Sequence, residues 1–244
     1  MAEKVAIVTG GAKGIGRAIG LDLAEQGWSI AFCYRTSADA AKATAEALRA
    51  KGARVLEGRY DVSDPAACEA LVSRVLGEWG RVDALVNGAG PYVREPLLDT
   101  SVESWREMFA SNLDSVFYMS RLVARPMQEQ KSGRIVSFSM ANADQMIGQP
   151  HLAAHYIAKV GVLILTRSLA RILAPYNVTV NAVSPGFIAS GSAPDAELQK
   201  MVKNIPAGYV GELKDAVAAV RFLLSEEARY VTGANIHLSG GWGI

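Results

Sequence analysis

The chain has 244 residues; half are hydrophobic, one fifth are charged, and the net charge is +1. This composition is typical of a folded globular protein and argues against intrinsic disorder. The charges are scattered, so nothing indicates a nucleic acid or a membrane surface as a partner. The longest apolar run, residues 160–165, is far shorter than the roughly 20 residues that cross a bilayer, and no signal-peptide pattern is visible. We therefore expect a cytoplasmic protein.

Short β-branched runs alternate with longer helical patterns along the chain. Seven runs are predicted to be strands: residues 4–10, 28–35, 53–62, 82–90, 133–140, 177–186 and 233–241. Most are continuously apolar, as in a parallel sheet that is covered on both faces. Asp64 and Pro65 predict a helix N-cap and first turn, and Thr100 to Glu103 predicts a capping box. We predict one α/β domain over residues 1–244, a Rossmann-type doubly wound parallel sheet of seven strands flanked by helices.

A glycine-rich segment, VTGGAKGIG, joins the first predicted strand to the first predicted helix. Gly10, Gly14 and Gly16 follow the spacing G-x-x-x-G-x-G. Glycines are needed where the chain turns tightly and where a β-carbon would keep a pyrophosphate away from a helix N-terminus. Between a strand and a helix, the segment predicts a dinucleotide site that includes Lys13 and Ile15.

The end of the second predicted strand indicates which dinucleotide binds. A carboxylate there would accept a hydrogen bond from the ribose 2′-hydroxyl of NAD, but the segment reads CYRTS, with Arg35 and Thr36 and no acid. Arg35 and Lys13 could pair with the 2′-phosphate of NADP, or both could be solvated surface charges. Asp61, after the third strand, is expected at the adenine edge or, alternatively, in an ordinary turn. We predict NADP(H) as the cofactor.

The chain resembles the short-chain dehydrogenase/reductases, and within them the NADPH-dependent 3-oxoacyl-[acyl-carrier-protein] reductases. The matching motifs are TGGAKGIG at 9–16, DV at 61–62, NGAG at 87–90, SNLDSVF at 111–117, GRIVSFS at 133–139, AKVGVLILTRSLA at 158–170, NAVSPGFIAS at 181–190 and YVTGANIHLSGG at 230–241. The resemblance implies hydride transfer from a nicotinamide to a small-molecule carbonyl or acyl-thioester substrate. It also implies a homotetramer or dimer that packs through helices around residues 102–130 and 152–174.

The resemblance further implies roles for single residues. Lys159 would bind the nicotinamide ribose and lower the pKa of a catalytic residue four positions earlier, while Asn112 would hold a water in a proton relay. The adenosine side would be lined by Val62, Asn87, Gly88 and Ala89. The carboxamide would be held by Pro185, Gly186 and Ile188, with Ser190 where a threonine is usual. A loop at about residues 190–208 would cover the substrate.

The chain departs from the family pattern at the proton donor. The family has Y-x-x-x-K, but the residue four before Lys159 is His155, and Tyr156 follows it. Gly148 and Pro150 keep the family's spacing to His155. At about 100° per residue, His155 lies about 40° from Lys159 around a helix, and Tyr156 lies about 60° away on the other side. We favour His155 as the proton donor, with Tyr156 as the alternative.

The serine that the family places after GRIVSFS is also replaced, by Met140. Ser139 precedes it, but neighbouring strand residues face opposite ways, so its hydroxyl should point away from the site. The segment 141–147 is longer than is usual in the family. It either brings Asn142 or Asp144 to the substrate or, in the simpler interpretation, uses them as loop caps.

These replacements bear on activity. A thioether cannot donate a hydrogen bond to a developing oxyanion, and the loss of one such donor typically costs about 10²–10³ in rate. A histidine cation would lie one turn from the Lys159 ammonium, which lowers the histidine pKa below about 6.5. The sequence therefore predicts either a reductase with a remodelled acid site or a cofactor-binding sensor or silent subunit. Cys33 and Cys68 lack metal-ligand spacing, so no metal site is expected.

Overall fold

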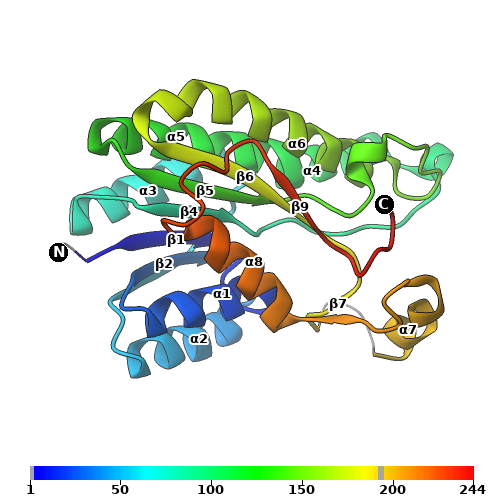
Figure 1. Ribbon diagram of the computed structural model, residues 1–244, viewed down its shortest axis with the longest axis horizontal. Helices are drawn as coiled ribbons and strands as arrows, with labels where there is room; N and C mark the ends of the chain where they lie inside the picture. Colours follow the sequence, from blue (N-terminus) through cyan, green and yellow to red (C-terminus); the bar gives the residue numbers. More distant parts are fainter. Residues whose placement is uncertain (1–2, 192–194) are drawn as a thin grey trace.

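The structure, a computed structural model, describes residues 3–191 and 195–244 (Figure 1). Within these ranges the main sheet has seven strands in the order β3-β2-β1-β4-β5-β6-β9, and every neighbouring pair is parallel. The strands are β1 (Val5–Thr9), β2 (Ser29–Tyr34), β3 (Val55–Arg59), β4 (Ala84–Asn87), β5 (Gly133–Phe138), β6 (Val178–Pro185) and β9 (Asn235–Leu238). The predicted Rossmann-type fold is confirmed. The strand order reverses between β1 and β4, and open α/β sheets bind their ligands at this kind of position.

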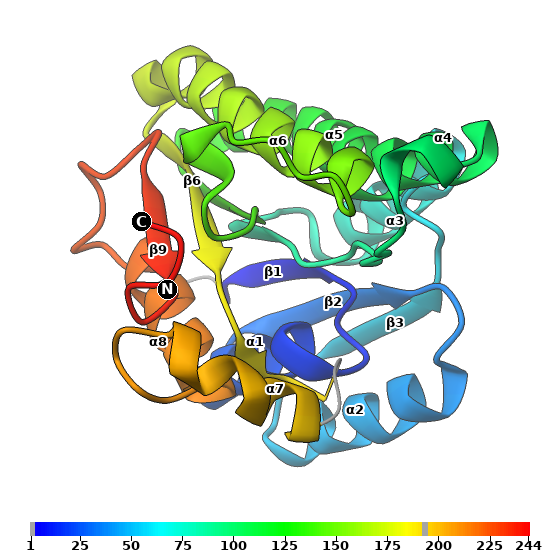
Figure 2. The same cartoon turned by 90° about the vertical axis from the view of Figure 1, so that its right-hand side faces the viewer.

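Helices cover both faces of the sheet (Figure 2). One layer contains α1 (Gly14–Glu25), α2 (Ala38–Ala50) and α8 (Leu213–Leu224). The other contains α3 (Pro65–Trp79), α4 (Val102–Phe109), α5 (Ser115–Gln130) and α6 (Ala153–Leu173). Each layer packs its own apolar core against the sheet, one around Ile19 and Leu223 and the other around Met119 and Leu173. Because helices cover both faces of the sheet, every residue of the central strands β1 and β5 is buried.

The helix starts follow the predicted signals with one correction. Asp64 caps α3, since its side chain accepts a hydrogen bond from the Ala66 amide at 3.0 Å, and Pro65 is the first helical residue. The predicted cap at Thr100 is wrong by one residue. Ser101 caps α4 through the Ser104 amide at 3.0 Å, because the Thr100 hydroxyl donates to the carbonyl of the preceding turn.

The chain leaves the main sheet after β6 and makes a smaller excursion beside the carboxyl ends of the strands (Figure 1). Two short parallel strands, β7 (Ile188–Ala189) and β8 (Gly211–Glu212), pair at its base and were not predicted. Between them lies α7 (Asp195–Met201). The predicted substrate loop, about 190–208, falls in this excursion, and its residues 192–194 lie outside the described part of the chain.

Among the described residues, no helix combines the length and apolarity that a membrane crossing requires. In the same part of the chain, no group of three or more His, Cys, Asp or Glu side chains is placed to hold a metal ion. Both cysteines are buried and free.

Candidate active site

A cavity of about 640 Å³ opens at the carboxyl ends of β1 to β4, where the strand order reverses. Predicted cofactor residues make up much of its wall: Gly10, Lys13, Gly14, Ile15, Gly16, Arg35, Thr36, Asp61, Val62, Gly88 and Ala89. Asn87 lies beneath this wall, where its amide donates to the hydroxyls of Ser120 and Ser137. The carboxamide candidates Pro185, Gly186 and Ile188 are placed beyond the wall by β6 and β7.

The glycine loop fits a dinucleotide phosphate. Gly10 and Gly14 have φ values of 68° and 56°, a left-handed conformation that other residues rarely adopt. A β-carbon on Gly16 would lie 2.6 Å from the Gly10 carbonyl oxygen, so the close turn requires glycine. Lys13, the N-cap residue of α1, makes no side-chain cap, which leaves the helix N-terminus available to an anion.

Thr9 joins the glycine loop to the segment after β4. Its buried hydroxyl oxygen accepts hydrogen bonds from the amides of Gly88 and Ala89, both at 3.1 Å. This contact holds two walls of the cavity together across the sheet. Sequence reasoning missed Thr9 because a β-branched residue at the end of a strand has an ordinary structural explanation.

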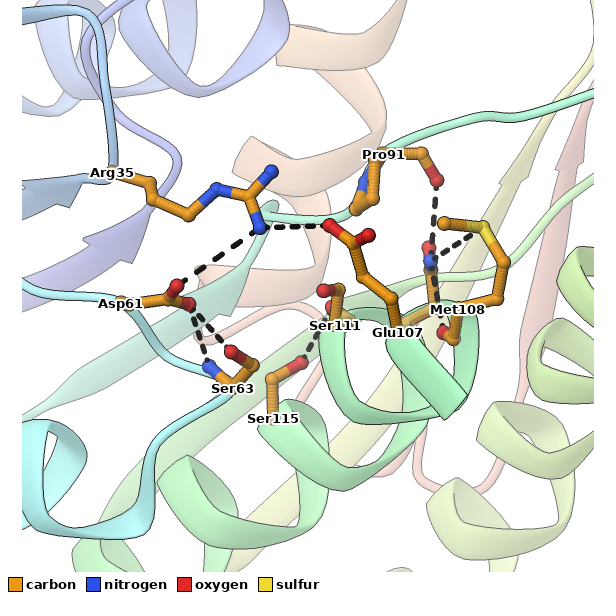
Figure 3. A network of polar contacts seen from close by, with 9 residues as sticks. Arg35, Asp61, Ser63, Pro91, Glu107, Met108, Ser111 and Ser115 are labelled. Atoms are coloured by element: carbon orange, nitrogen blue, oxygen red, sulfur yellow. Dashed lines mark hydrogen bonds and ion pairs between the residues drawn. The ribbon is translucent and has the colours of Figure 1, made fainter. Parts of the chain in front are cut away.

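Arg35, in the wall of the cavity, lies between two carboxylates (Figure 3). Its Nη1 is 3.1 Å from Glu107 Oε1 and 3.9 Å from Asp61 Oδ2. Asp61 also accepts hydrogen bonds from the amide and the hydroxyl of Ser63, which forms a turn after β3. Both interpretations of Asp61 therefore have a structural basis, since it is a turn residue that also faces the cavity.

Lys159 and Asn112 meet near Gly90, next to the cavity. A β-carbon on Gly90 would lie 2.4 Å from Asn112 Oδ1 and 3.6 Å from Lys159 Nζ. Lys159 is buried, donates to the Phe138 carbonyl at 2.9 Å, and has its pKa lowered to about 8 by that burial. No carboxylate of the described residues pairs with it, so its charge is available to a bound ligand.

Asn112 is presented by a π-helical turn, Ala110–Asp114, that joins α4 to α5. Its Nδ2 donates to the carbonyls of Pro91 and Met108, both at 3.1 Å, and this fixes the orientation of the amide. Its Oδ1 is buried and accepts no hydrogen bond from the described residues. A buried acceptor without a partner is a place for a water molecule or a ligand hydroxyl.

His155 lies in the first turn of α6, one turn before Lys159, and is buried. Burial and the Lys159 ammonium lower the pKa of the imidazole to about 4, and the nearby Pro91 carbonyl opposes this shift. Its Nδ1 is buried and has no hydrogen-bond partner among the described residues. The Tyr92 ring packs edge-on against the imidazole, with centroids 5.2 Å apart.

The comparisons with known proteins agree with this architecture. A family model described as enoyl-(acyl carrier protein) reductase matches residues 10–243. The chain is 36% identical to the 3-oxoacyl-[acyl-carrier-protein] reductase FabG of Staphylococcus aureus (strain N315), over 98% of this chain and 97% of that protein. It is 37% identical to the reductase of the same name from Escherichia coli (strain K12), over 98% and 96%. The chain belongs to the short-chain dehydrogenase/reductase family.

Two solved structures give the same result. A mutant short-chain dehydrogenase/reductase from Serratia marcescens superposes with a TM-score of 0.93 at 33% identity, over 100% of this chain and 99% of that one. An acetoin dehydrogenase from Enterobacter cloacae superposes with a TM-score of 0.89, also at 33% identity, over 98% and 95%. The protein is therefore an NAD(P)H-dependent oxidoreductase.

In this short-chain dehydrogenase/reductase, the hydroxyl of Tyr156 is hydrogen-bonded to the backbone of the segment 141–147. Its hydroxyl donates to the Asn142 carbonyl at 2.7 Å and accepts from the Ile147 amide at 3.1 Å. Both contacts draw the phenol towards the loop that precedes α6. The ring is buried, so this tyrosine stabilises the segment 141–147 against the helix.

Neither Met140, at the family's serine position, nor the preceding Ser139 offers a free hydroxyl to a substrate. Ser139 is buried and donates to the Lys159 carbonyl at 2.8 Å, so its hydroxyl is engaged with the backbone of α6. Met140 is half-buried and packs against a small cluster of Ala143, Leu163 and Ala182. Its thioether is a weak acceptor and cannot donate.

The segment 141–147 is bound to the C-terminal part of the chain. Asp144 Oδ2 lies 2.8 Å from His237 Nε2 on β9, and Gln145 Nε2 donates to the Gly243 carbonyl at 3.0 Å. Asn142 has a left-handed φ of 61° and begins the short 3₁₀ turn that follows. Neither side chain acts as the predicted loop cap: Asp144 contacts β9, and Asn142 makes no cap hydrogen bond, its buried Oδ1 having no partner among the described residues.

Proposed function

We propose that the protein is an NADPH-dependent reductase of 3-oxoacyl thioesters or related ketones. The FabG relatives, at 36–37% identity, carry the name 3-oxoacyl-[acyl-carrier-protein] reductase. One observation carries the proposal: a buried Lys159 without a carboxylate partner and an unpartnered Asn112 Oδ1 meet beside the nucleotide cavity. In such a site a bound nicotinamide supplies the hydride.

Different residues of the site bind different parts of the cofactor. The glycine loop and the N-terminus of α1 hold the pyrophosphate, and Arg35 with Lys13 pairs with the 2′-phosphate. Lys159 donates to the nicotinamide ribose. The adenosine contacts are Asp61, Val62, Gly88 and Ala89, and the carboxamide contacts are Pro185, Gly186 and Ile188. The excursion at about 190–208 covers the substrate, and copies of the chain assemble into a homotetramer or dimer.

His155 is the proton donor in this proposal. It lies one turn before Lys159, and its buried Nδ1 has no hydrogen-bond partner among the described residues, which leaves that nitrogen available to a ligand. Tyr156 is less suited because its hydroxyl already makes two hydrogen bonds with the segment 141–147. Since Met140 replaces the family's serine, the carbonyl oxygen has one donor fewer, and slow turnover follows.

A second function has support from the same site. With a pKa of about 4, His155 is almost entirely neutral at pH 7 and is then a weak acid. Together with Met140, this favours a protein that binds NADPH and turns it over very slowly, as a sensor or a silent subunit would. The two functions differ in turnover and agree in cofactor binding.

His155→Phe and Tyr156→Phe test the assignment. We expect both variants to bind NADPH in a fluorescence titration, because neither residue lines the nucleotide cavity. Turnover of a panel of 3-oxoacyl thioesters, diketones and quinones should fall by about 10²-fold or more in His155→Phe and persist in Tyr156→Phe. Turnover that survives the first change and disappears with the second would make Tyr156 the donor. NADPH binding by the unmodified protein with no turnover across the panel would favour the second function.

A further inference from the structure

Glu107 brings a carboxylate from helix α4 to the mouth of the nucleotide cavity. Its Oε1 accepts a hydrogen bond from Arg35 Nη1 at 3.1 Å, across 72 positions of sequence. Figure 3 shows the guanidinium between two carboxylates, with Glu107 on the side of α4 and Asp61 at the end of β3. Glu107 does not itself form part of the cavity wall, whereas Arg35 does.

The ion pair is one that a bound phosphate can displace. The side chains of Arg35 and Glu107 are 46% and 53% exposed, and exposed ion pairs of this kind are weak. The backbone of Arg35 is held separately, because its carbonyl accepts a hydrogen bond from Arg59 Nε at 3.0 Å. The guanidinium can therefore change partner while its main chain stays in place.

Charges of both signs surround Arg35 at this end of the cavity. Of the described residues, Lys13 and Asp61 share the cavity wall with Arg35, while Glu107 and Arg59 contact Arg35 from outside the wall. A 2′-phosphate, which is close to a dianion at neutral pH, would compete with Glu107 for Arg35 and be repelled by its carboxylate. A cofactor with a free 2′-hydroxyl has no charge there and would be nearly indifferent to Glu107.

We propose that Glu107 is a positioning residue that weakens NADPH binding selectively, by competing with the 2′-phosphate for Arg35. It thereby sets the NADPH-to-NADH preference without touching the nicotinamide or the substrate. This inference rests on the proposed role of Arg35 as the 2′-phosphate ligand.

Glu107→Gln tests the proposal, because it removes the charge and keeps the size of the side chain. Its matched control is Glu103→Gln, an exposed acid in the first turn of the same helix. We expect Glu107→Gln to lower the Kd for NADPH by about two- to fivefold, the scale of one exposed ionic competitor, with little change in the Kd for NADH. The gain should shrink at high salt, because ions screen an exposed pair. Glu103→Gln should leave unchanged the ratio of the Kd for NADH to the Kd for NADPH, which measures the preference for NADPH.

Arg35→Ala, alone and combined with Glu107→Gln, separates this inference from the proposed function. The gain from Glu107→Gln should disappear in the Arg35→Ala background, as expected when one residue acts through the other. If Arg35→Ala leaves the ratio of Kd values unchanged, Arg35 does not bind the 2′-phosphate, and both the NADPH preference and the role of Glu107 are wrong. Alternatively, Arg35→Ala lowers the ratio of the Kd for NADH to the Kd for NADPH, as the proposed function requires. If Glu107→Gln then has no effect, or strengthens the binding of both cofactors equally, only the role of Glu107 is wrong.

Discussion

His155 and Lys159 are two basic groups buried one helical turn apart. The imidazole pKa falls to about 4 through burial and the ammonium charge, while burial lowers the pKa of Lys159 to about 8. At neutral pH the lysine is therefore mostly protonated and the histidine mostly neutral. A protonated lysine can donate hydrogen bonds to ribose hydroxyls. The imidazolium form of His155, which is the stronger acid of the two, is only a small fraction of the protein at this pH.

The rate of carbonyl reduction should consequently rise as the pH falls. Above its pKa of about 4, the protonated fraction of His155 decreases tenfold for each pH unit, so kcat is expected to increase about tenfold per unit from pH 8 down to pH 5. Loss of the Lys159 proton above about pH 8 adds to the decline on the alkaline side. The measurement is kcat against pH at saturating NADPH, with 4-deuterated NADPH to verify that hydride transfer limits the rate. A flat profile from pH 5 to 7 would show that the His155 cation is not the acid.

At the scale of elements, the segment 141–147 connects the active site to two distant parts of the chain. It is bonded to Tyr156 on α6, and Asp144 faces His237 on β9. Left-handed backbone at Asn142 and Met146 shapes the turn. The segment thus lies between Met140 and the proposed proton donor His155, and hydrogen bonds tie it to α6 and to β9.

The paired change Met140→Ser with His155→Tyr asks whether side chains or this segment limit turnover. It restores a hydroxyl donor at residue 140 and places a phenol one turn from Lys159, whose charge favours the phenolate and so lowers the pKa of the phenol. We expect carbonyl reduction at pH 7 to increase by about 10²-fold or more, the scale of one oxyanion donor. Steady-state kinetics of both single variants and the double variant measure the effect. If the double variant shows no gain while NADPH binding is intact, the segment 141–147 is what disables the site.

Elements of the main sheet were predictable because buried parallel strands are continuous apolar runs, and the glycine loop was predictable because its backbone excludes β-carbons. The pair β7–β8 was missed since two residues show no periodicity. Glu107 was missed because its partner Arg35 is 72 positions away, and a charged residue on an exposed helix face has an ordinary explanation. The two hydrogen bonds of Tyr156 depend on a loop conformation that helix geometry alone does not predict.

At the scale of the whole molecule, helix α6 exposes apolar residues on its outer face. Ile157, Ile164 and Ile172 are 46%, 58% and 61% exposed, and at about 100° per residue they fall within about 80° of one another. Exposed apolar stripes of this kind are typical of contacts between subunits. The stripe lies on one of the helices through which we propose that copies of the chain associate.

Ile164→Glu should therefore lower the oligomeric state. A charge at the centre of the stripe would be buried without a partner in the assembled form, and the assembly should dissociate to smaller species. Size-exclusion chromatography with light scattering measures the mass, and NADPH binding reports whether each subunit stays folded. Ala43→Glu, an exposed position on α2 in the other layer, is the matched control. An unchanged mass in Ile164→Glu would place the interface elsewhere.

The contact between the segment 141–147 and the end of the chain also matters for how the protein is handled. Gln145 holds the Gly243 carbonyl, and the Trp242 ring packs against Phe187 with centroids 4.8 Å apart. An affinity tag fused after Ile244 would begin beside these residues and could alter turnover without any change in the catalytic side chains. Strand β1 begins on the opposite side of the molecule (Figure 1), so a purification handle placed ahead of it is expected to leave the active-site loops undisturbed.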